Sequence, residues 1–208
     1  MKKYISLSFD DGPNFEGDST MSDMLDILQK HKVPASFFLI GNKISDSNIS
    51  VIKRAFDMGC DIENHSWTHP HMSRLTAEEI IEEYDKTDKA IEKITGRTPQ
   101  FFRPPYIDTS DTLFKCIKVP FICGKDCRDW EDSVGVEERL KMLLEAAEDR
   151  TIFLLHVTDK NTKTLETVDR LIPLLQKDGY EFVTVPRLFE MEGLEKTNTG
   201  RLWSVVKN

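Results

Sequence analysis

Two adjacent carboxylates, Asp10 and Asp11, follow a segment at residues 4–9 whose Tyr4, Ile5, Leu7 and Phe9 are typical of a largely buried strand. Such a strand has no structural use for two neighbouring charges at its end. Like charges this close repel, so both stay ionised only beside a cation, and otherwise one carboxyl group takes up a proton. The pair therefore predicts a metal site or an acid–base pair. The alternative is a solvent-facing pair that merely caps the next segment.

His65 and His69 are a second candidate pair, spaced four residues apart. On one helical turn this spacing brings both imidazoles to the same side, as in metal-binding histidine pairs, although two surface histidines would show the same spacing. Two imidazoles and one carboxylate would make a site with positions open for water and substrate, which is typical of a catalytic rather than a structural divalent metal. His71, close by, is assigned no role.

Three further side chains carry chemistry near strand ends. Arg103 lies between two phenylalanines and two prolines, which favours a buried acidic partner such as Asp10. Trp130 fits either the core or a substrate groove, because indoles serve both purposes. His156 ends an apolar run, and Asp129 is a candidate partner to orient its ring.

The elements that must position these residues alternate along the chain. Hydrophobic spacing, Gly and Pro punctuation and a capping box beginning at Thr76 indicate them. We expect strands at 4–9, 35–40, 60–64, 100–103, 119–123, 151–156 and 181–185, and helices at 19–31, 49–56, 76–96, 135–149 and 163–178. Pro173 predicts a kink in the last helix or a helix start near 173.

Seven strands alternating with helices predict an α/β fold of parallel βα units, either an open doubly wound sheet or a barrel. A complete eight-unit barrel takes about 250 residues, so 208 residues suit an incomplete (β/α) barrel resembling a TIM barrel with one unit missing. No linker divides the chain, which predicts a single catalytic domain over residues 1–208. In such a fold the carboxyl ends of the strands open on one face, so the candidate residues should converge there.

The charge balance narrows the possible partners. The sequence has 28 basic and 36 acidic residues, a formal net charge of −8. A nucleic-acid or anionic-membrane partner would need a basic face, so we expect neither, and a neutral or cationic ligand suits the chain better. No obligatory protein partner is inferred.

The N-terminus and the cysteines predict a reducing compartment. Met1-Lys2-Lys3 runs straight into the first strand without an apolar leader, so we expect a cytoplasmic protein, or a secreted one if the N-terminus has been trimmed. Four cysteines at irregular spacing do not form a disulfide framework. Cys116, Cys123 and Cys127 suit buried free thiols better than a thiolate metal cluster.

Five segments, taken in order, resemble the motifs of the NodB-homology polysaccharide deacetylases, carbohydrate esterase family 4. They are Ser8-Phe9-Asp10-Asp11-Gly12-Pro13, His65-Ser66-Trp67-Thr68-His69, Arg103-Pro104-Pro105-Tyr106, Asp126-Cys127-Arg128-Asp129-Trp130 and Leu154-Leu155-His156. The resemblance spans residues 8–156. It implies a distorted (β/α) barrel and the metal-dependent removal of acetyl groups from carbohydrate.

The resemblance also implies a metal centre. Asp11, His65 and His69 would hold a divalent ion, with Zn²⁺ expected first and Co²⁺ or another divalent ion as alternatives. Such an ion would lower the pKa of the attacking water and polarise the acetyl carbonyl.

Carried over in the same way, the remaining residues take catalytic and substrate-binding roles. Asp10 would be the general base and Arg103 its partner, while Asp129 would tune His156 as the general acid. Tyr106 would offer its backbone N–H to the oxyanion. The substrate-binding residues would be Trp130, bordering the acetyl pocket, with Tyr106 and Pro105.

Two departures from the family pattern affect the expected substrate. Ile107 stands where the family usually has glycine, which would narrow the groove beside the oxyanion donor, and Lys125 and Cys127 are unusual in the next loop. The leading hypothesis is an N-deacetylase of acetylated amino sugars, of chitooligosaccharide or peptidoglycan type. The alternatives are an O-acetyl esterase of acetylated xylan and a non-catalytic carbohydrate-binding relative.

Overall fold

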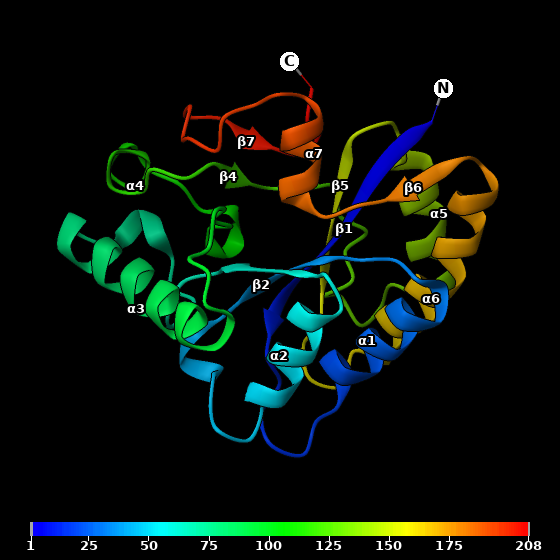
Figure 1. The fold of residues 1–208 in the computed structure, drawn as a ribbon, viewed down its shortest axis with the longest axis horizontal. Helices are drawn as coiled ribbons and strands as arrows, with labels where there is room; N and C mark the ends of the chain where they lie inside the picture. Colours follow the sequence, from blue (N-terminus) through cyan, green and yellow to red (C-terminus); the bar gives the residue numbers. More distant parts are fainter. Residues whose placement is uncertain (1, 208) are drawn as a thin grey trace.

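The chain is organised around one long buried strand, β1 (Lys3–Gly12), which crosses the centre of the computed structural model (Figure 1). The structure describes residues 2–207. β1 is buried along most of its length because it has parallel neighbours on both edges and helices over its outer face, where Ile5, Leu7 and Phe9 join the core.

The strands around β1 all run parallel to it. β2 (Ser36–Leu39) and β6 (Tyr180–Phe182) pair with one edge of β1 and β3 (Asp61–Asn64) pairs with β2, while β5 (Thr151–His156) pairs with the other edge. A second, two-stranded sheet pairs β4 (Phe121–Ile122) with β7 (Leu202–Trp203).

Three single parallel bridges connect the two sheets into a ring. They join Asn64 to Phe102, Phe102 to Phe121, and Lys125 to Phe153. The circuit therefore runs from β1 through β2, β3, Phe102 and the β4 segment to β5 and back to β1. Closure by isolated bridges makes this a distorted, incomplete (β/α) barrel, which confirms the expected fold class.

Most helices lie outside the ring, whereas the helix at Val185–Met191 packs against the inward-facing side chains Phe38, Phe101 and Ile152. Figure 1 shows α3 and α4 on one side and α1, α5 and α6 together on the other. The α-helices are α1 (Thr20–His31), α2 (Ile49–Asp57), α3 (Ala77–Thr95), α4 (Asp111–Cys116), α5 (Val136–Ala146), α6 (Thr162–Lys177) and α7 (Val185–Met191). Three short 3₁₀ turns span Gly41–Lys43, Met72–Arg74 and Pro105–Ile107.

Several predicted elements differ from those observed. The strand expected at 100–103 is reduced to the bridge at Phe102, because the prolines on both sides have no N–H to donate to a ladder. The strand expected at 181–185 ends at Phe182, since Thr184 caps helix α7. Pro173 lies inside an unbroken α6, so the alternative of a helix start near 173 is wrong. α4, α7 and β7 were not predicted from the sequence.

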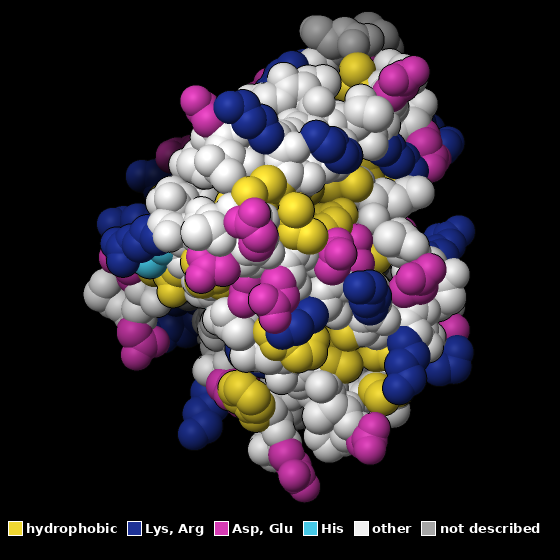
Figure 2. Space-filling model, turned by 90° about the vertical axis from the view of Figure 1, so that its left-hand side faces the viewer, with side chains coloured by type: hydrophobic (Ala, Val, Ile, Leu, Met, Phe, Trp, Pro, Cys, Tyr) yellow, Lys and Arg dark blue, Asp and Glu magenta, His cyan; other side chains and the backbone are white. Residues whose placement is uncertain are grey.

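The cysteines are only partly as expected, because Cys60 and Cys127 are buried whereas Cys116 and Cys123 are partly exposed. All four cysteines are free thiols, and Asp11, His65 and His69 form the one metal-competent group found within residues 2–207, so a thiolate cluster is not supported. On the face drawn in Figure 2, basic side chains are interleaved with acidic ones around small hydrophobic patches. Within the described residues, no helix is both long enough and apolar enough to cross a membrane.

Candidate active site

The candidate residues come together at the carboxyl ends of the strands. Asp10 lies in register with His156 on the neighbouring strand, and Arg103 follows the Phe102 bridge. Asp129 belongs to the loop after β4, and His65 follows β3 directly. Residues from five separate segments therefore meet at one end of the barrel, as the parallel topology predicts.

A β-bulge separates the two aspartates. Asp10 pairs with Phe38 and Gly12 with Leu39, so Asp11 is an extra residue in β1, and its φ of 70° lies in the left-handed region. A bulge re-aims the side chain that it carries. Asp10 consequently points into the barrel, where it is 2% exposed, while Asp11 turns towards the histidines.

Asp11, His65 and His69 form a cluster that suits a divalent cation. Asp11 Oδ1 lies 3.6 Å from His65 Nε2 and 3.5 Å from His69 Nε2, and the three ligand atoms all lie within 4.8 Å of one another. Asp11 Oδ1 is buried and accepts no hydrogen bond. A buried carboxylate oxygen without a donor, facing two ring nitrogens, has the donor set and spacing of a divalent metal site, so the residues present fit such an ion.

His65 is held in the tautomer that a metal ligand needs. Its Nδ1 lies 2.7 Å from the backbone oxygen of Arg103, so Nδ1 carries the hydrogen and the Nε2 lone pair faces Asp11. Burial lowers the pKa of His65 to about 3, against the opposing charge of Asp11. Burial also lowers the pKa of His69. Both rings are thus neutral and able to coordinate near neutral pH.

The two histidines lie on a loop and not on the expected helical turn. Ser66 and His69 have φ values of 68° and 59°, which fold the backbone back on itself. Glu83 of α3 supports this loop by accepting hydrogen bonds from the backbone N–H groups of Trp67 and Thr68 and from the Thr68 hydroxyl. The two imidazoles therefore come together because these tertiary contacts fold the loop, and not because the residues lie on one helical turn.

Asp10 and Arg103 form the buried ion pair that the sequence suggested. Arg103 Nη1 donates to Asp10 Oδ1 at 2.5 Å, and Nη2 donates to the Ser8 hydroxyl at 2.7 Å. The other carboxylate oxygen, Oδ2, lies 3.6 Å from His65 Nε2 and so faces the metal cluster. Burial raises the pKa of Asp10, although the Arg103 charge opposes it. A buried carboxylate with one oxygen anchored and the other facing the site is suited to accept a proton.

His156 and Asp129 form the second pair. Asp129 Oδ1 lies 2.7 Å from His156 Nδ1, and Oδ2 accepts the backbone N–H of His156 at 2.8 Å. Burial by itself would lower the pKa of His156, but the hydrogen bond and charge of Asp129, with Asp10 and Asp11 further away, raise it to about 9. An imidazole that keeps its proton at neutral pH is suited to donate it to a leaving group.

One cavity of about 420 Å³ connects the two pairs with the metal cluster. Besides the aspartates and histidines, its walls are formed by Pro104, Tyr106, Ile107, Cys123, Asp126, Trp130 and Leu154. Tyr106 and Trp130 are 61% and 53% exposed, so both can contact a ligand. Trp130 therefore borders the cavity and is not part of the core. Pro105, expected to bind substrate, is buried and does not line the cavity; its neighbour Pro104 does.

The cavity wall at Tyr106 and Ile107 has an unusual backbone. Both residues have positive φ, 58° and 53°, in the 3₁₀ turn after Pro104. This conformation is strained for a β-branched residue such as Ile107, which explains why a glycine is expected at that position. The Tyr106 ring stacks on His71, with centroids 4.3 Å apart, so His71 supports this wall.

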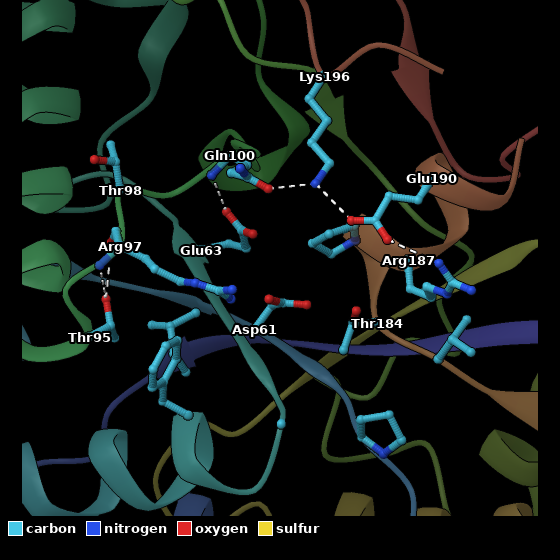
Figure 3. Close-up of a pocket in the computed structure, with 16 residues that line it drawn as sticks. Asp61, Glu63, Thr95, Arg97, Thr98, Gln100, Thr184, Arg187, Glu190 and Lys196 are labelled. Atoms are coloured by element: carbon cyan, nitrogen blue, oxygen red, sulfur yellow. Dashed lines mark hydrogen bonds and ion pairs between the residues drawn. The ribbon is translucent and has the colours of Figure 1, made fainter. Parts of the chain in front are cut away.

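A larger cavity, of about 710 Å³, lies at the opposite end of the barrel (Figure 3). Asp61 and Glu63 of β3 lie at its centre, and Lys196 bridges Gln100 and Glu190 at its rim. It contains none of the residues predicted to act in catalysis. In parallel barrels, chemistry is concentrated at the carboxyl ends of the strands, so the smaller cavity is the candidate active site despite its size.

Comparison with known proteins decides the family. Residues 1–119 match the family model described as "Polysaccharide deacetylase". The chain belongs to the polysaccharide deacetylase family.

Members of this family resemble the chain over nearly all of its length. A "Bifunctional xylanase/deacetylase" from Pseudobutyrivibrio xylanivorans is 40% identical over 99% of the chain and 34% of that protein. A "Chitooligosaccharide deacetylase" from a Bradyrhizobium species is 33% identical over 88% of the chain and 90% of that protein. A solved family 4 acetyl xylan esterase from Clostridium thermocellum, in complex with a cobalt ion, is 36% identical, with a TM-score of 0.93 over 98% of the chain and 99% of that structure.

The curated relatives are longer than this chain. The chain spans between a third and two fifths of the length of the first curated relatives that it matches.

Sequence reasoning missed several residues that hold the site together. Lys43 donates from Nζ to the backbone oxygen of Asp11 at 2.9 Å, and Ser8 accepts from Arg103. Thr164 donates from its hydroxyl to Asp129 Oδ2 at 2.9 Å. Ser8 alone had a signal in the sequence, as a polar residue inside an apolar strand. Lys43 and Thr164 reach the site from loops and helices whose placement depends on the whole fold.

Proposed function

We propose that this polysaccharide deacetylase domain hydrolyses acetyl groups from carbohydrate with the help of a divalent metal ion. The observation that carries the proposal is the meeting, in one cavity, of the Asp11, His65 and His69 cluster with Asp10 on one side and His156 on the other. A metal site between a proton acceptor and a proton donor is the minimum set for hydrolysis of an acyl bond.

Zn²⁺ is the ion that we propose. Two imidazoles and one carboxylate with open positions are a common ligand set for catalytic zinc, and cobalt accepts the same donors. When bound, the ion would act as a Lewis acid that makes a coordinated water more acidic and polarises the acetyl carbonyl.

Asp10 would take the proton from the attacking water. Its Oδ2 faces the metal cluster, while Arg103 and Ser8 fix the carboxylate from behind. Burial raises the pKa of Asp10, which makes it a stronger base than an exposed aspartate. Tyr106 lies on the cavity wall where its backbone N–H would face the developing oxyanion.

His156 would deliver a proton to the leaving group. Its Nδ1 is engaged by Asp129, so Nε2 is the atom left to donate. The indole of Trp130 meets the His156 ring edge to face, with centroids 5.5 Å apart, and forms the adjoining wall. Trp130 and Leu154 line the same cavity as His156 and Asp10, so they would offer apolar contacts to the acetyl methyl group.

N-acetylated amino sugars are the first substrate class that we propose. An amine is a poor leaving group unless it is protonated, and the buried Asp129 partner that keeps His156 charged is suited to that task. The match to the chitooligosaccharide deacetylase, over almost its full length, supports this class.

Acetylated xylan is the second candidate, and a separate observation favours it. The relatives with higher identity are named as a xylanase/deacetylase and an acetyl xylan esterase. Ester hydrolysis would use the same site and would depend less on proton donation by His156.

Acetate release from three substrates tests the proposal. The purified domain, loaded with zinc, is assayed on N-acetylated chitooligosaccharides, on acetylxylan and on a chromogenic aryl acetate. Release from either carbohydrate supports the proposed function, and the faster one identifies the substrate class. Binding of carbohydrate without acetate release from any of the three would identify a non-catalytic relative and refute the proposal.

A further inference from the structure

Arg139, in helix α5, is buried as completely as Arg103 but lacks a direct acidic partner. Its side chain is 1% exposed. Arg103 neutralises Asp10, whereas within the described chain the hydrogen bonds of the Arg139 guanidinium all go to neutral oxygens. Burying a charge without an opposite charge is unfavourable, because the charge loses its hydration. A buried arginine without an acidic partner is therefore expected to have a role that offsets this cost.

The guanidinium joins two segments that border the active site. Nε donates to the backbone oxygen of Val134 at 3.0 Å, and Nη2 donates to that of Glu131 at 3.1 Å. Nη1 donates to Asn161 Oδ1 at 3.1 Å and to the Thr164 hydroxyl at 3.0 Å. Arg139 thereby ties the loop that carries Asp129 to the start of helix α6.

Both side chains that accept from Arg139 donate in turn to the acid pair. The Thr164 hydroxyl donates to Asp129 Oδ2 at 2.9 Å. Asn161 Nδ2 lies 3.3 Å from the backbone oxygen of Asp129 and 3.4 Å from that of His156.

The direction of these bonds is fixed by Arg139. A hydroxyl has one hydrogen, and because Thr164 Oγ1 accepts from the guanidinium, that hydrogen is directed to Asp129. In the same way, the Asn161 oxygen faces Arg139, so the amide nitrogen faces the backbone of Asp129 and His156. A donor that itself accepts from a cation is also polarised, which strengthens its bond to the carboxylate.

We propose that Arg139 is a positioning residue for the general acid, acting through Thr164 and Asn161 on Asp129 and through Asp129 on His156. It also offsets the charge of the buried Asp129 carboxylate at the moment when His156 has given up its proton. The proposal rests on the proposed role of His156, but not on which acetylated carbohydrate is cleaved.

The leaving group separates this role from a purely structural one. A sugar amine or alkoxide needs a proton to leave, whereas 4-nitrophenolate leaves without one. Arg139→Met and Thr164→Val should each lower kcat on the acetylated carbohydrate by about 10- to 100-fold, the usual effect of removing a supporting hydrogen bond at a reacting group. Both variants should hydrolyse 4-nitrophenyl acetate at close to the parent rate. Arg139→Lys, which keeps the charge but not the planar fork, should recover part of the loss.

Arg150→Met is the matched control. Arg150 is also largely buried and donates to Glu192, but it precedes the first residue of β5, at the opposite end of that strand from His156. This variant should lower thermal stability without changing the ratio of the two activities.

A second readout needs neither metal nor substrate. The Nδ1–H proton of His156 is observed by NMR in the metal-free protein, where the bond to Asp129 should give a downfield, slowly exchanging signal. In Arg139→Met and Thr164→Val the exchange should be faster, and the double variant should add little to either single variant, since both break one relay.

The outcomes distinguish failure of this inference from failure of the proposed function. If both activities fall in parallel, or if the His156 proton is unchanged in folded Arg139→Met and Thr164→Val, Arg139 has a structural role only and the inference is wrong. If the parent protein releases acetate from no carbohydrate, the proposed function fails, while the NMR comparison still decides whether Arg139 positions His156.

Discussion

Replacing Ile107 tests whether the strained wall of the active site controls substrate choice. Ile107 has a φ of 53° and lines the catalytic cavity. A left-handed conformation costs a residue with a side chain about 1–2 kcal/mol, which Ile107→Gly would relieve. Against this stand about 0.5–1 kcal/mol for the greater freedom of glycine in the unfolded chain and about 1 kcal/mol for losing a half-buried side chain.

These contributions nearly cancel, so Ile107→Gly should change the free energy of unfolding by less than about 1 kcal/mol, or a few degrees in Tm for a chain of this size. Ile107→Ala is the matched variant, because it loses most of the side chain but keeps the strain. The Ile107→Gly variant should therefore have a free energy of unfolding about 1 kcal/mol higher than that of Ile107→Ala. Inside a helix, the order of glycine and alanine is the reverse.

The assays are urea unfolding of the three proteins and kcat/KM on the panel of chitooligosaccharide, acetylxylan and aryl acetate. Ile107→Gly should favour the bulkier carbohydrate over the aryl acetate, because the groove beside Tyr106 widens. If Ile107→Ala proves as stable to urea as Ile107→Gly, the strain argument is refuted. If all three substrates change by the same factor, Ile107 does not shape the groove.

Three further predictions concern the metal and the acid. Exhaustive chelation should abolish acetate release, and Zn²⁺ or Co²⁺ should restore it; full activity of protein shown to be metal-free by elemental analysis would contradict the mechanism. Asp129→Asn should move the alkaline limb of the pH–rate profile to lower pH, because Asp129 raises the pKa of His156 and the acid must be protonated. The same shift affects stability: the folded pKa of His156, about 9, exceeds the unfolded value of 6.5, so its contribution is complete below pH 6.5 and is lost as the pH rises through 9. Urea unfolding between pH 6 and 10 should show this loss in the parent protein and not in Asp129→Asn; an equal slope in both would refute the assignment.

The sequence predicted those site residues that lie at the ends of strands. Asp10, Asp11 and His156 end apolar runs, and parallel topology alone brings such residues together. The pairing of Arg103 with Asp10 also followed from an arginine placed between apolar residues and prolines. These inferences depend on burial and strand order, which the hydrophobic pattern encodes.

Features that depend on long-range contacts could not be predicted. The loop of His65 and His69 is held by Glu83, which lies on a helix whose position follows only from the assembled barrel. β7 is two residues long and shows no periodic pattern. Arg139 looks like any polar residue of an amphipathic helix until its partners Asn161 and Thr164 are placed around it.

The central claim is that the two neighbouring aspartates have different duties, and the metal content of two variants tests it directly. Asp11→Asn should lose both metal and activity, because a neutral amide is a much poorer ligand for a divalent cation than a carboxylate. Asp10→Asn should keep its metal and lose about 10²- to 10⁴-fold in turnover, the usual contribution of a positioned general base. Elemental analysis of each purified variant beside its rate of acetate release gives the answer. A metal-free Asp10→Asn with a loaded Asp11→Asn would reverse the two assignments, and two loaded, active variants would show that this strand end is not the catalytic centre.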